Sequence, residues 1–287
     1  MDKIDVINKM QDYINHHIDE NITMQDLAKV SFYSPWYSYR LFIEYLNLTP
    51  SDYIRRLRLS KSALELRDNK AKILDIALKY GYESVDGYQR AFRHEFGMNP
   101  NEYAKNSVPI CLFIPYKKTK ERKEKKIMSN VKNVFITVIE KPERKVIIKR
   151  GIKATEYFEY CAEVGCDVWG ILKSMKSISG EPVCLWLPKK YQELNTSEYV
   201  QGIEVDINYN GVVPSGMDVI NLPKSKYIMF QGEKFEEEDF EDAIITLKES
   251  ILKYDPKILG YKYDLDNPRI QLEPIGERGY IELLPIK

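Results

Sequence analysis

The sequence is poor in the residues that cross-link small folds and build metal sites. Its 287 residues include only four cysteines. Four are too few for a disulfide framework, and none forms a Cys-x-x-Cys pair of the zinc type, so we expect reduced packing residues. No apolar run approaches the roughly 20 residues that span a bilayer. The N-terminus also lacks a signal-peptide pattern, and we therefore expect a cytoplasmic protein with no membrane partner.

Histidine is scarcer still. His16, His17 and His94 all lie in the first hundred residues. The C-terminal half therefore has no histidine for a Ser-His-Asp triad or a His-metal site, and the chain has no Walker-type or dinucleotide glycine pattern. We expect that the chain is not an enzyme and that it carries neither cofactor nor metal.

Net charge is also absent, because 43 Lys and Arg balance 43 Asp and Glu. Neutrality usually argues against a nucleic-acid binder. The charges are unevenly distributed, however: residues 1–106 hold 15 basic and 15 acidic side chains, residues 107–133 hold 8 and 2, and residues 134–287 hold 20 and 26. The sequence thus predicts a neutral N-terminal part, a basic connector and an acidic C-terminal part.

Residues 28–50 and 77–100 are two copies of one unit. Ala28 and Tyr33 match Ala77 and Tyr82 at an offset of 49. After one inserted residue the offset is 50, as shown by Arg40 with Arg90, Phe42 with Phe92, Pro50 with Pro100 and Tyr53 with Tyr103. Such regular matches indicate an internal repeat.

Each copy predicts two helices joined by a tight turn. Thr23 is a candidate N-cap of the first helix, and Ser34 with Pro35 marks the start of the second, which runs to about Leu46. Asn47 stands where the second copy has Gly97, a position typical of a left-handed helix end. Two helices in this arrangement form a helix-turn-helix, whose second helix can enter a DNA major groove.

Helical spacing predicts which side chains of each second helix face outward. The inward positions are Leu41, Phe42 and Tyr45 in the first copy and Tyr88, Phe92 and Phe96 in the second. The outward positions are Pro35, Trp36, Tyr39 and Arg40, and Val85, Asp86, Gln89 and Arg90. A solvated surface is the alternative for these positions, but an exposed Trp36 beside an arginine favours DNA contact.

Residues 1–106 resemble the DNA-binding domain of the AraC/XylS family. The resemblance rests on AKVSFYSPWYSYRLF (28–42), LTPSDYIRRLRL (48–59) and IALKYGYESVDGYQRAFRHEFGMNPNEY (76–103). It implies an all-α domain in which a long helix, about Pro50–Leu66, bridges two helix-turn-helix units that read successive major grooves of double-stranded DNA. It carries over Trp36, Arg40, Gln89 and Arg90 as DNA-binding positions, to which we add Tyr39, Arg55, Arg56 and Arg93. Ser38 departs from the family pattern at a normally apolar position.

The connector, residues 107–130, has the core KKTKERKEKK (117–126). It has no apolar periodicity, so we expect an exposed linker that serves either as a tether or as an additional DNA contact.

The C-terminal part, residues 131–287, predicts an α+β domain. The first half has strands 134–140 and 145–150, a helix 155–174 and strands 182–187 and 198–206. The second half has strand 226–231, helix 236–253 and strands 269–274 and 280–286. These elements form two tandem β-α-β-β units, with the helices expected on one side of the sheet.

Alternation along these strands suggests a ligand face. We assign the apolar residues to the side under the helices and therefore place Trp186, Glu204, Glu273, Tyr280 and Glu282 on the opposite side. Aromatic rings beside carboxylates suit an apolar cation. The alternative is an open sheet whose carboxylates are merely solvated.

Residues 131–287 resemble the GyrI-like effector-binding domain, and the whole arrangement is similar to Rob-type regulators. The motifs are LWLP (185–188), EYVQGIEVD (198–206), YIMFQGE (227–233), PRIQLEP (268–274) and RGYIELLPI (278–286). The resemblance implies a small amphipathic effector, often a cationic drug. Lys262 stands where many members carry a ligand-binding glutamate, so Glu204, Glu273 or Glu282 would have to supply that charge.

The sequence therefore predicts a DNA-binding transcriptional regulator whose C-terminal domain binds a small effector, with RNA polymerase as a further partner. Two alternatives remain for the C-terminal domain. It could be a protein-docking module that uses EEEDFED (236–242), or a hydrolase like some stand-alone GyrI-like proteins.

Overall fold

The computed structural model describes residues 2–69, 71–117, 133–165, 167–236 and 239–287. The chain divides into two compact units, residues 1–123 and 124–287. Most of the expected basic core, 117–126, and residues 237–238 of the acidic stretch lie outside the described residues.

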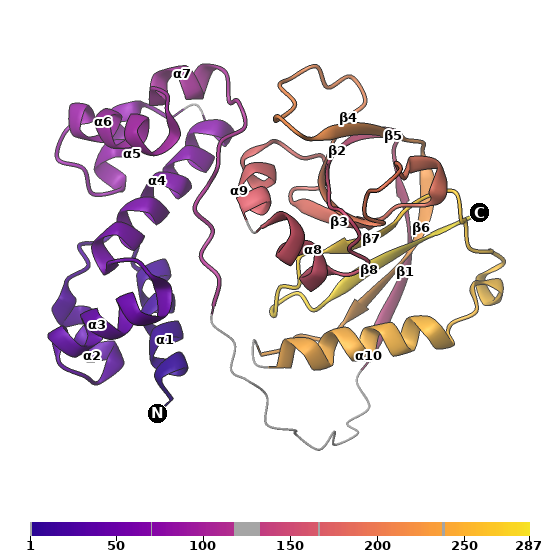
Figure 1. The fold of residues 1–287 in the computed structure, drawn as a ribbon, viewed down its shortest axis with the longest axis horizontal. Helices are drawn as coiled ribbons and strands as arrows, with labels where there is room; N and C mark the ends of the chain where they lie inside the picture. Colours follow the sequence, from indigo (N-terminus) through magenta and orange to yellow (C-terminus); the bar gives the residue numbers. More distant parts are fainter. Residues whose placement is uncertain (1, 70, 118–132, 166, 237–238) are drawn as a thin grey trace. The chain divides into compact units, whose positions relative to one another are not determined.

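The N-terminal unit is all-α in its regular structure. Its helices are α1 (Lys3–His16), α2 (Met24–Ser31), α3 (Pro35–Leu46), α4 (Pro50–Asp68), α5 (Ile73–Lys79), α6 (Val85–Phe96) and α7 (Pro100–Lys105). The long helix α4 joins the group α1–α3 to the group α5–α7, as Figure 1 shows. The predicted pair of helix-turn-helix units and the bridging helix are therefore confirmed.

Local capping explains where these helices begin and end. Thr23 and Asp26 form a reciprocal capping box at the start of α2, and the Ser34 hydroxyl accepts the Tyr37 N–H at the start of α3. Asn47 and Gly97 end α3 and α6 in the left-handed conformation, with φ of 54° and 76°.

The polar residue Ser38 is buried without being left unsatisfied. Its hydroxyl lies 2.7 Å from that of Ser31 on α2 and donates to the Ser34 carbonyl at 3.0 Å. A second serine therefore compensates for the departure from an apolar residue at this position.

The helix α4 contributes to two apolar cores. Tyr53 and Leu57, in its first half, pack with Phe42 and the α1 side chains. Leu59, Ala63 and Leu66, in its second half, pack with Tyr88, Phe92 and Tyr103. Because one continuous helix supplies both cores, it sets the spacing of the two helix-turn-helix units.

Residues 107–117, which we call the strap, pack against this unit. Ile110 and Leu112 are buried in the second core, and Phe113 packs against the first. The Phe113 N–H donates to the Ser60 hydroxyl at 2.8 Å, and Lys117 pairs with Asp12 at 3.0 Å. The expectation that a linker begins at residue 107 is corrected, because apolar anchors along the strap hold it across both cores.

The C-terminal unit is α+β, as predicted. Its strands are β1 (Val134–Lys141), β2 (Arg144–Arg150), β3 (Pro182–Trp186), β4 (Tyr199–Asp206), β5 (Asp218–Leu222), β6 (Ser225–Gly232), β7 (Arg269–Leu272) and β8 (Ile281–Ile286). Its α-helices are α8 (Tyr157–Val164), α9 (Asp167–Ser174) and α10 (Phe240–Lys253), with short 3-10 turns at Lys189–Tyr191 and Pro256–Leu259.

The strands form one antiparallel sheet in the order β1-β6-β8-β7-β3-β4-β2-β5. The tandem units β2-α8-α9-β3-β4 and β6-α10-β7-β8 meet at the β3–β7 pair. Each unit also lends a strand to the other, because β1 pairs with β6 and β5 pairs with β2. The exchange of these two strands was not predicted.

Three element assignments are corrected. The helix expected at 155–174 is interrupted, because Gly165 ends α8 with φ of 87° before α9 begins at Asp167. Helix α10 begins at Phe240 instead of Glu236. The strand β5 was missed.

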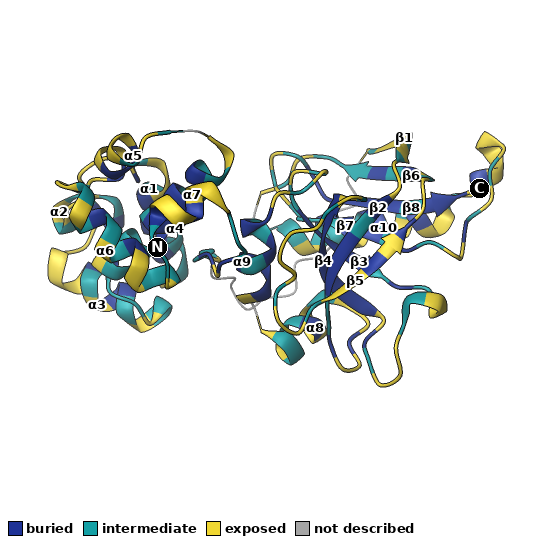
Figure 2. Cartoon of the chain, turned by 90° about the horizontal axis from the view of Figure 1, so that it is seen from above, coloured by how far each residue is buried: buried dark blue, intermediate teal, exposed yellow. Residues whose placement is uncertain are grey.

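Both faces of the central strands of the sheet are buried, whereas the edge strand β1 is largely exposed. The helices cover one face, where α9 packs on Ile147 and Ile203 and α10 packs on Ile228 and Phe230. On the other face a continuous apolar cluster runs from Val146 on β2 to Tyr227 on β6. Arg144 donates to the Tyr227 hydroxyl at 3.2 Å, although four strands lie between theirs. The twisted sheet thus curls so that β2 and β6, the strands next to its two edges, approach each other, and the middle strands are dark blue in Figure 2.

Candidate functional site

The first recognition helix, α3, presents an aromatic and a basic side chain to solvent. Trp36 is 68% exposed, and Arg40 is also exposed. The half-buried Tyr39 ring stacks on Trp36, with centroids 6.4 Å apart and an interplanar angle of 11°. Leu41 and Phe42 are buried, as predicted, and orient the helix so that Trp36 and Arg40 face outward.

The second recognition helix, α6, is oriented in the same way. Tyr88 and Phe92 are buried, whereas Arg90 and Arg93 are exposed and Gln89 is half-buried. Figures 1 and 2 show α3 and α6 on the same side of α4. One side of the unit therefore carries both helices that the repeat predicts to enter major grooves.

Arg55 and Arg56 on α4 are engaged within the unit. Their guanidinium groups bind the Glu95 carboxylate of α6 at 3.0 and 2.7 Å, and Arg56 also lies over the Phe113 ring at 4.8 Å. Glu95 is only 10% exposed. These two arginines connect the bridging helix to the second recognition helix, an arrangement that no local pattern in the sequence indicates.

Glu204 lies on the side of the sheet away from the helices, as predicted, but it is fully buried. Its carboxylate binds Arg144 at 2.5 Å and Lys141 at 2.7 Å, and it accepts the Ser179 hydroxyl at 2.8 Å. Burial alone would raise the pKa of Glu204, but the two cations outweigh it and lower that pKa. With its charge already compensated, Glu204 is a structural ion and not a free ligand for a cation.

Trp186, Glu273, Tyr280 and Glu282 lie on the helix side of the sheet, which corrects their predicted placement. The Trp186 Nε1 donates to the Thr155 carbonyl at 2.9 Å, Glu273 pairs with Lys173 of α9 at 3.5 Å, and Tyr280 belongs to the core under α10. The apolar neighbours Val183, Leu185 and Ile270 fill the other face. The alternation of apolar and polar side chains along these strands was predicted correctly. The apolar set, however, lies on the concave face of the curled sheet and not under the helices.

A row of polar side chains crosses the helix side of the central strands. Gln201, Cys184, Gln271 and Glu282 are successive register partners on β4, β3, β7 and β8, and we call them the polar row. The Tyr199 hydroxyl donates to Gln271 Oε1 at 3.1 Å. Within the described part of the chain, the buried Gln201 Oε1 has no hydrogen-bond partner. The sequence did not indicate Gln201 and Gln271 as candidate site residues, because only the strand register shows that they lie on either side of Cys184.

Glu282 is neutralised by its neighbours. Arg269 donates through Nε to Glu282 Oε2 at 2.6 Å, and the Tyr280 hydroxyl donates to Oε1 at 2.7 Å. The Arg269 guanidinium also lies 4.6 Å over the Trp186 ring. Burial, reinforced by Glu282, raises the pKa of Tyr280, and burial raises the pKa of Cys184 to about 12, so both remain protonated.

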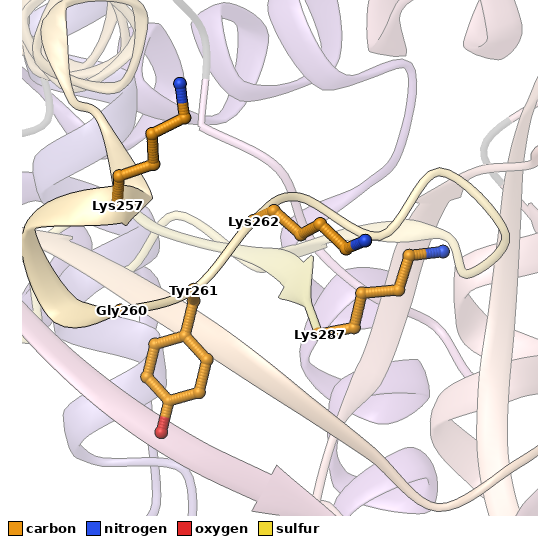
Figure 3. Close-up of a pocket in the computed structure, with 5 residues that line it drawn as sticks. All are labelled: Lys257, Gly260, Tyr261, Lys262 and Lys287. Carbon is orange, nitrogen blue, oxygen red and sulfur yellow. The ribbon is translucent and has the colours of Figure 1, made fainter.

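Lys262 lines a shallow hollow of about 390 Å³ together with Lys257, Gly260, Tyr261 and Lys287. Figure 3 shows the Lys262 and Lys287 side chains running the same way, whereas the Tyr261 ring points away from them. Asp264 and Asp266 hold the Lys287 ammonium at 2.9 and 3.1 Å. None of the predicted ligand residues lines this hollow.

The described residues contain no group of three or more His, Cys, Asp and Glu side chains placed to hold a metal ion. Within the same residues, no helix combines the length and apolarity needed to cross a bilayer.

The N-terminal unit is similar to known regulators. Residues 27–106 match a family model described as a helix-turn-helix domain. The regulatory protein SoxS of Salmonella typhimurium is 39% identical over 98 residues, which cover 34% of this chain and 92% of SoxS. The transposon Tn10 TetD protein of Escherichia coli is 38% identical over 103 residues, 36% of this chain and 75% of TetD.

A further relative matches over a similar share of the chain. The transcriptional regulator Rob of Salmonella typhimurium is 35% identical over 107 residues, 37% of each protein. A solved AraC-type regulator from Chromobacterium violaceum is 26% identical with a TM-score of 0.34, over 35% of this chain and 90% of its own. The two helix-turn-helix units, and the identity to SoxS over nearly its whole length, lead to one conclusion: the chain belongs to the AraC/XylS family of DNA-binding transcriptional regulators.

Proposed function

We propose that this regulator reads a two-part DNA site with α3 and α6 and responds to a small amphipathic effector bound by its C-terminal unit. The observation that carries the DNA-binding part is the arrangement of α3 and α6 on one side of α4. Contact with RNA polymerase is part of the proposal.

The side chains divide into readers and positioning residues. Trp36, Tyr39 and Arg40 contact bases in the first half-element, and Gln89 and Arg90 do so in the second. The exposed Arg93 binds a phosphate. Arg55 and Arg56 act mainly by holding α6 on α4 through Glu95. Local placement of cations on the reading side suffices for affinity even though the net charge of residues 1–106 is zero.

Selection of bound DNA from a random pool supplies the cognate site, and the full chain is then titrated with it. Arg40→Ala is expected to lose about 1–3 kcal/mol of binding free energy and to relax the base preference of the first half-element. Lys105→Ala, which removes the same charge from an exposed position at the end of α7, is the matched control. An Arg40→Ala isotherm equal to that of the control would contradict the role of α3.

For the C-terminal unit, we infer a GyrI-like effector-binding domain whose ligand meets the polar row. Support comes from the unpartnered Gln201 Oε1, a buried acceptor that a ligand donor would satisfy, and from the neighbouring Trp186 and Tyr280 rings. The ion pairs of Glu204 and Glu282, and the lysines around Lys262, favour a neutral amphiphile with a hydrogen-bond donor over a cation.

A thermal-shift screen of neutral and cationic amphiphiles tests this inference. The best neutral compound should quench the tryptophan fluorescence of the wild-type chain, and Trp186→Phe should remove that quenching while Trp36 and Trp169 still emit. Gln201→Leu should stabilise the free protein, because it removes an unsatisfied acceptor, and should weaken the ligand. Quenching that persists in Trp186→Phe would place the ligand elsewhere, and a screen without any hit would favour a protein-docking module.

A further inference from the structure

Phe32 occupies a backbone conformation that suits glycine. It follows α2 with φ of 60° and ψ of 23°, in the left-handed region. In the second copy of the repeat, 49 residues later, Gly81 stands at the same place with φ of 78°. A bulky residue in this region is strained, whereas glycine is not. The first helix-turn-helix therefore carries a side chain at a position where the second has none.

Packing within the described residues of the N-terminal unit does not account for the Phe32 side chain. Phe32 is 81% exposed, so burial in the core does not compensate for the backbone strain. Backbone strain that packing does not repay tends to occur at functional sites. The Phe32 ring is thus available for contact with a binding partner of the unit.

The neighbours of Phe32 form an uncharged aromatic surface. We define the aromatic patch as Phe32, Tyr33, Trp36 and Tyr37, all of which are exposed. Tyr33 and Tyr37 meet edge to face at 4.7 Å. Residues 30–39 contain no charged side chain. The patch is continuous with the start of α3, the end of a recognition helix that approaches base edges.

The corresponding surface of the second unit is different in kind. Residues 79–88 include Lys79, Glu83 and Asp86 as well as Gly81. The carboxylates of Glu83 and Asp86 can accept hydrogen bonds from cytosine amino groups, and Lys79, which pairs with Glu65 at 2.8 Å, is a cation. The aromatic patch has no cation with which to hold a phosphate, so its binding partner must offer apolar surface.

We propose that Phe32 is a further specificity-determining residue and that the aromatic patch reads thymine C5-methyl groups in the first half-element. The inference rests on the proposed DNA-binding mode of α3. The methyl group of thymine is the apolar feature of the major groove, and aromatic and other apolar side chains pack against it. Because this contact releases no counterions, the patch adds affinity that depends little on salt.

The test uses the full chain and the selected DNA site, with thymine or uracil in the first half-element. Uracil lacks only the methyl group. We expect uracil to weaken the wild-type complex about tenfold. Phe32→Gly and Phe32→Asn should bind the thymine site about tenfold more weakly than wild type, and their own uracil penalty should be severalfold smaller.

The variants keep the fold, because glycine and asparagine both adopt the left-handed conformation readily. Their unfolding midpoints should be at least equal to that of the wild type. Phe32→Tyr, which retains the ring, is the matched control and should keep both the affinity and the uracil penalty.

Two results would overturn the inference. One is wild-type affinity or an unchanged uracil penalty in Phe32→Gly and Phe32→Asn. The other is normal DNA binding by these variants together with lower transcription in a reconstituted assay, which would make the patch a protein contact. Failure of the underlying DNA-binding proposal looks different, since the wild-type chain would then show no base preference and no loss on Arg40→Ala.

Discussion

Glu95 holds the second recognition helix on the bridging helix, and its removal should be felt in DNA binding. A charge-assisted hydrogen bond contributes about 1.5–3 kcal/mol. Arg55 and Arg56 are 35% and 36% exposed, however, and solvent screening reduces the combined contribution to about 1–2 kcal/mol. We expect Glu95→Ala to lower the free energy of unfolding of the N-terminal unit by this amount.

The same substitution should loosen the alignment of α6 with α3. A loss of about 1–2 kcal/mol in docking lowers the population of the aligned arrangement by at most about 5- to 30-fold. Affinity for the complete two-part site should fall by up to that factor, whereas affinity for DNA that carries only the first half-element should not change. The assay is fluorescence anisotropy on the two DNAs at several salt concentrations. Glu44→Ala on α3, an exposed glutamate with a loose ion pair of 3.9 Å to Lys3, is the control of equal charge change.

A different outcome would refute this reasoning. If Glu95→Ala binds both DNAs more tightly and the salt dependence becomes steeper by about two released counterions, Arg55 and Arg56 are phosphate contacts that Glu95 restrains. Unchanged affinity for the complete site would show that the apolar core around Tyr88 and Phe92 alone aligns α6.

Two further predictions concern stability. Glu204→Gln should destabilise the C-terminal unit at neutral pH by about 3–5 kcal/mol, because it leaves Arg144 and Lys141 buried without a counter-charge. The pKa of Glu204 is lower in the folded chain than its ordinary 4.5, so its stabilisation is complete above about pH 4.5 and declines as the pH falls through the folded pKa. The free energies of unfolding of wild type and variant, measured by urea titration, should therefore converge in acid. A difference that stays constant with pH would contradict the ion cluster. Leu112→Ala in the strap should lower the free energy of unfolding of the N-terminal unit by about 2–3 kcal/mol, measured in denaturant titrations followed by Trp36 fluorescence. Cys111→Ala, at the exposed neighbouring position, is the control and should have little effect. Equal unfolding midpoints for the two variants would mean that the strap does not stabilise the unit.

Predictions from the sequence succeeded where the cause is local. The N-caps Thr23 and Ser34, the left-handed ends at Asn47 and Gly97 and the inward stripe Tyr88 and Phe92 depend on groups within a few residues, and the structure has all of them. The exposed Trp36 and Arg40 follow from the same helical geometry. Their contact with bases remains a prediction.

The ligand face shows where such reasoning stops. Period-two alternation separates Trp186 and Cys184 from Val183 and Leu185, but it does not say which set the helices cover. A sheet with one open face would place the apolar set under the helices. This sheet curls on itself, so its apolar set fills the curl, and Glu204 is the only predicted ligand residue on the expected side.

The sequence by itself determined the repeat, the helix boundaries of the reading units and the tandem order of the C-terminal unit, because capping, turns and periodicity act between near neighbours in the chain. Tertiary structure alone decided which groups meet across 40 or more residues. Arg55 binds Glu95, and Arg144 binds Glu204. The strap packs on both cores, and β1 pairs with β6. Such contacts follow from the packing of whole helices and strands. A pattern of residues along the sequence does not say how far apart two side chains lie in space when they are distant in the chain.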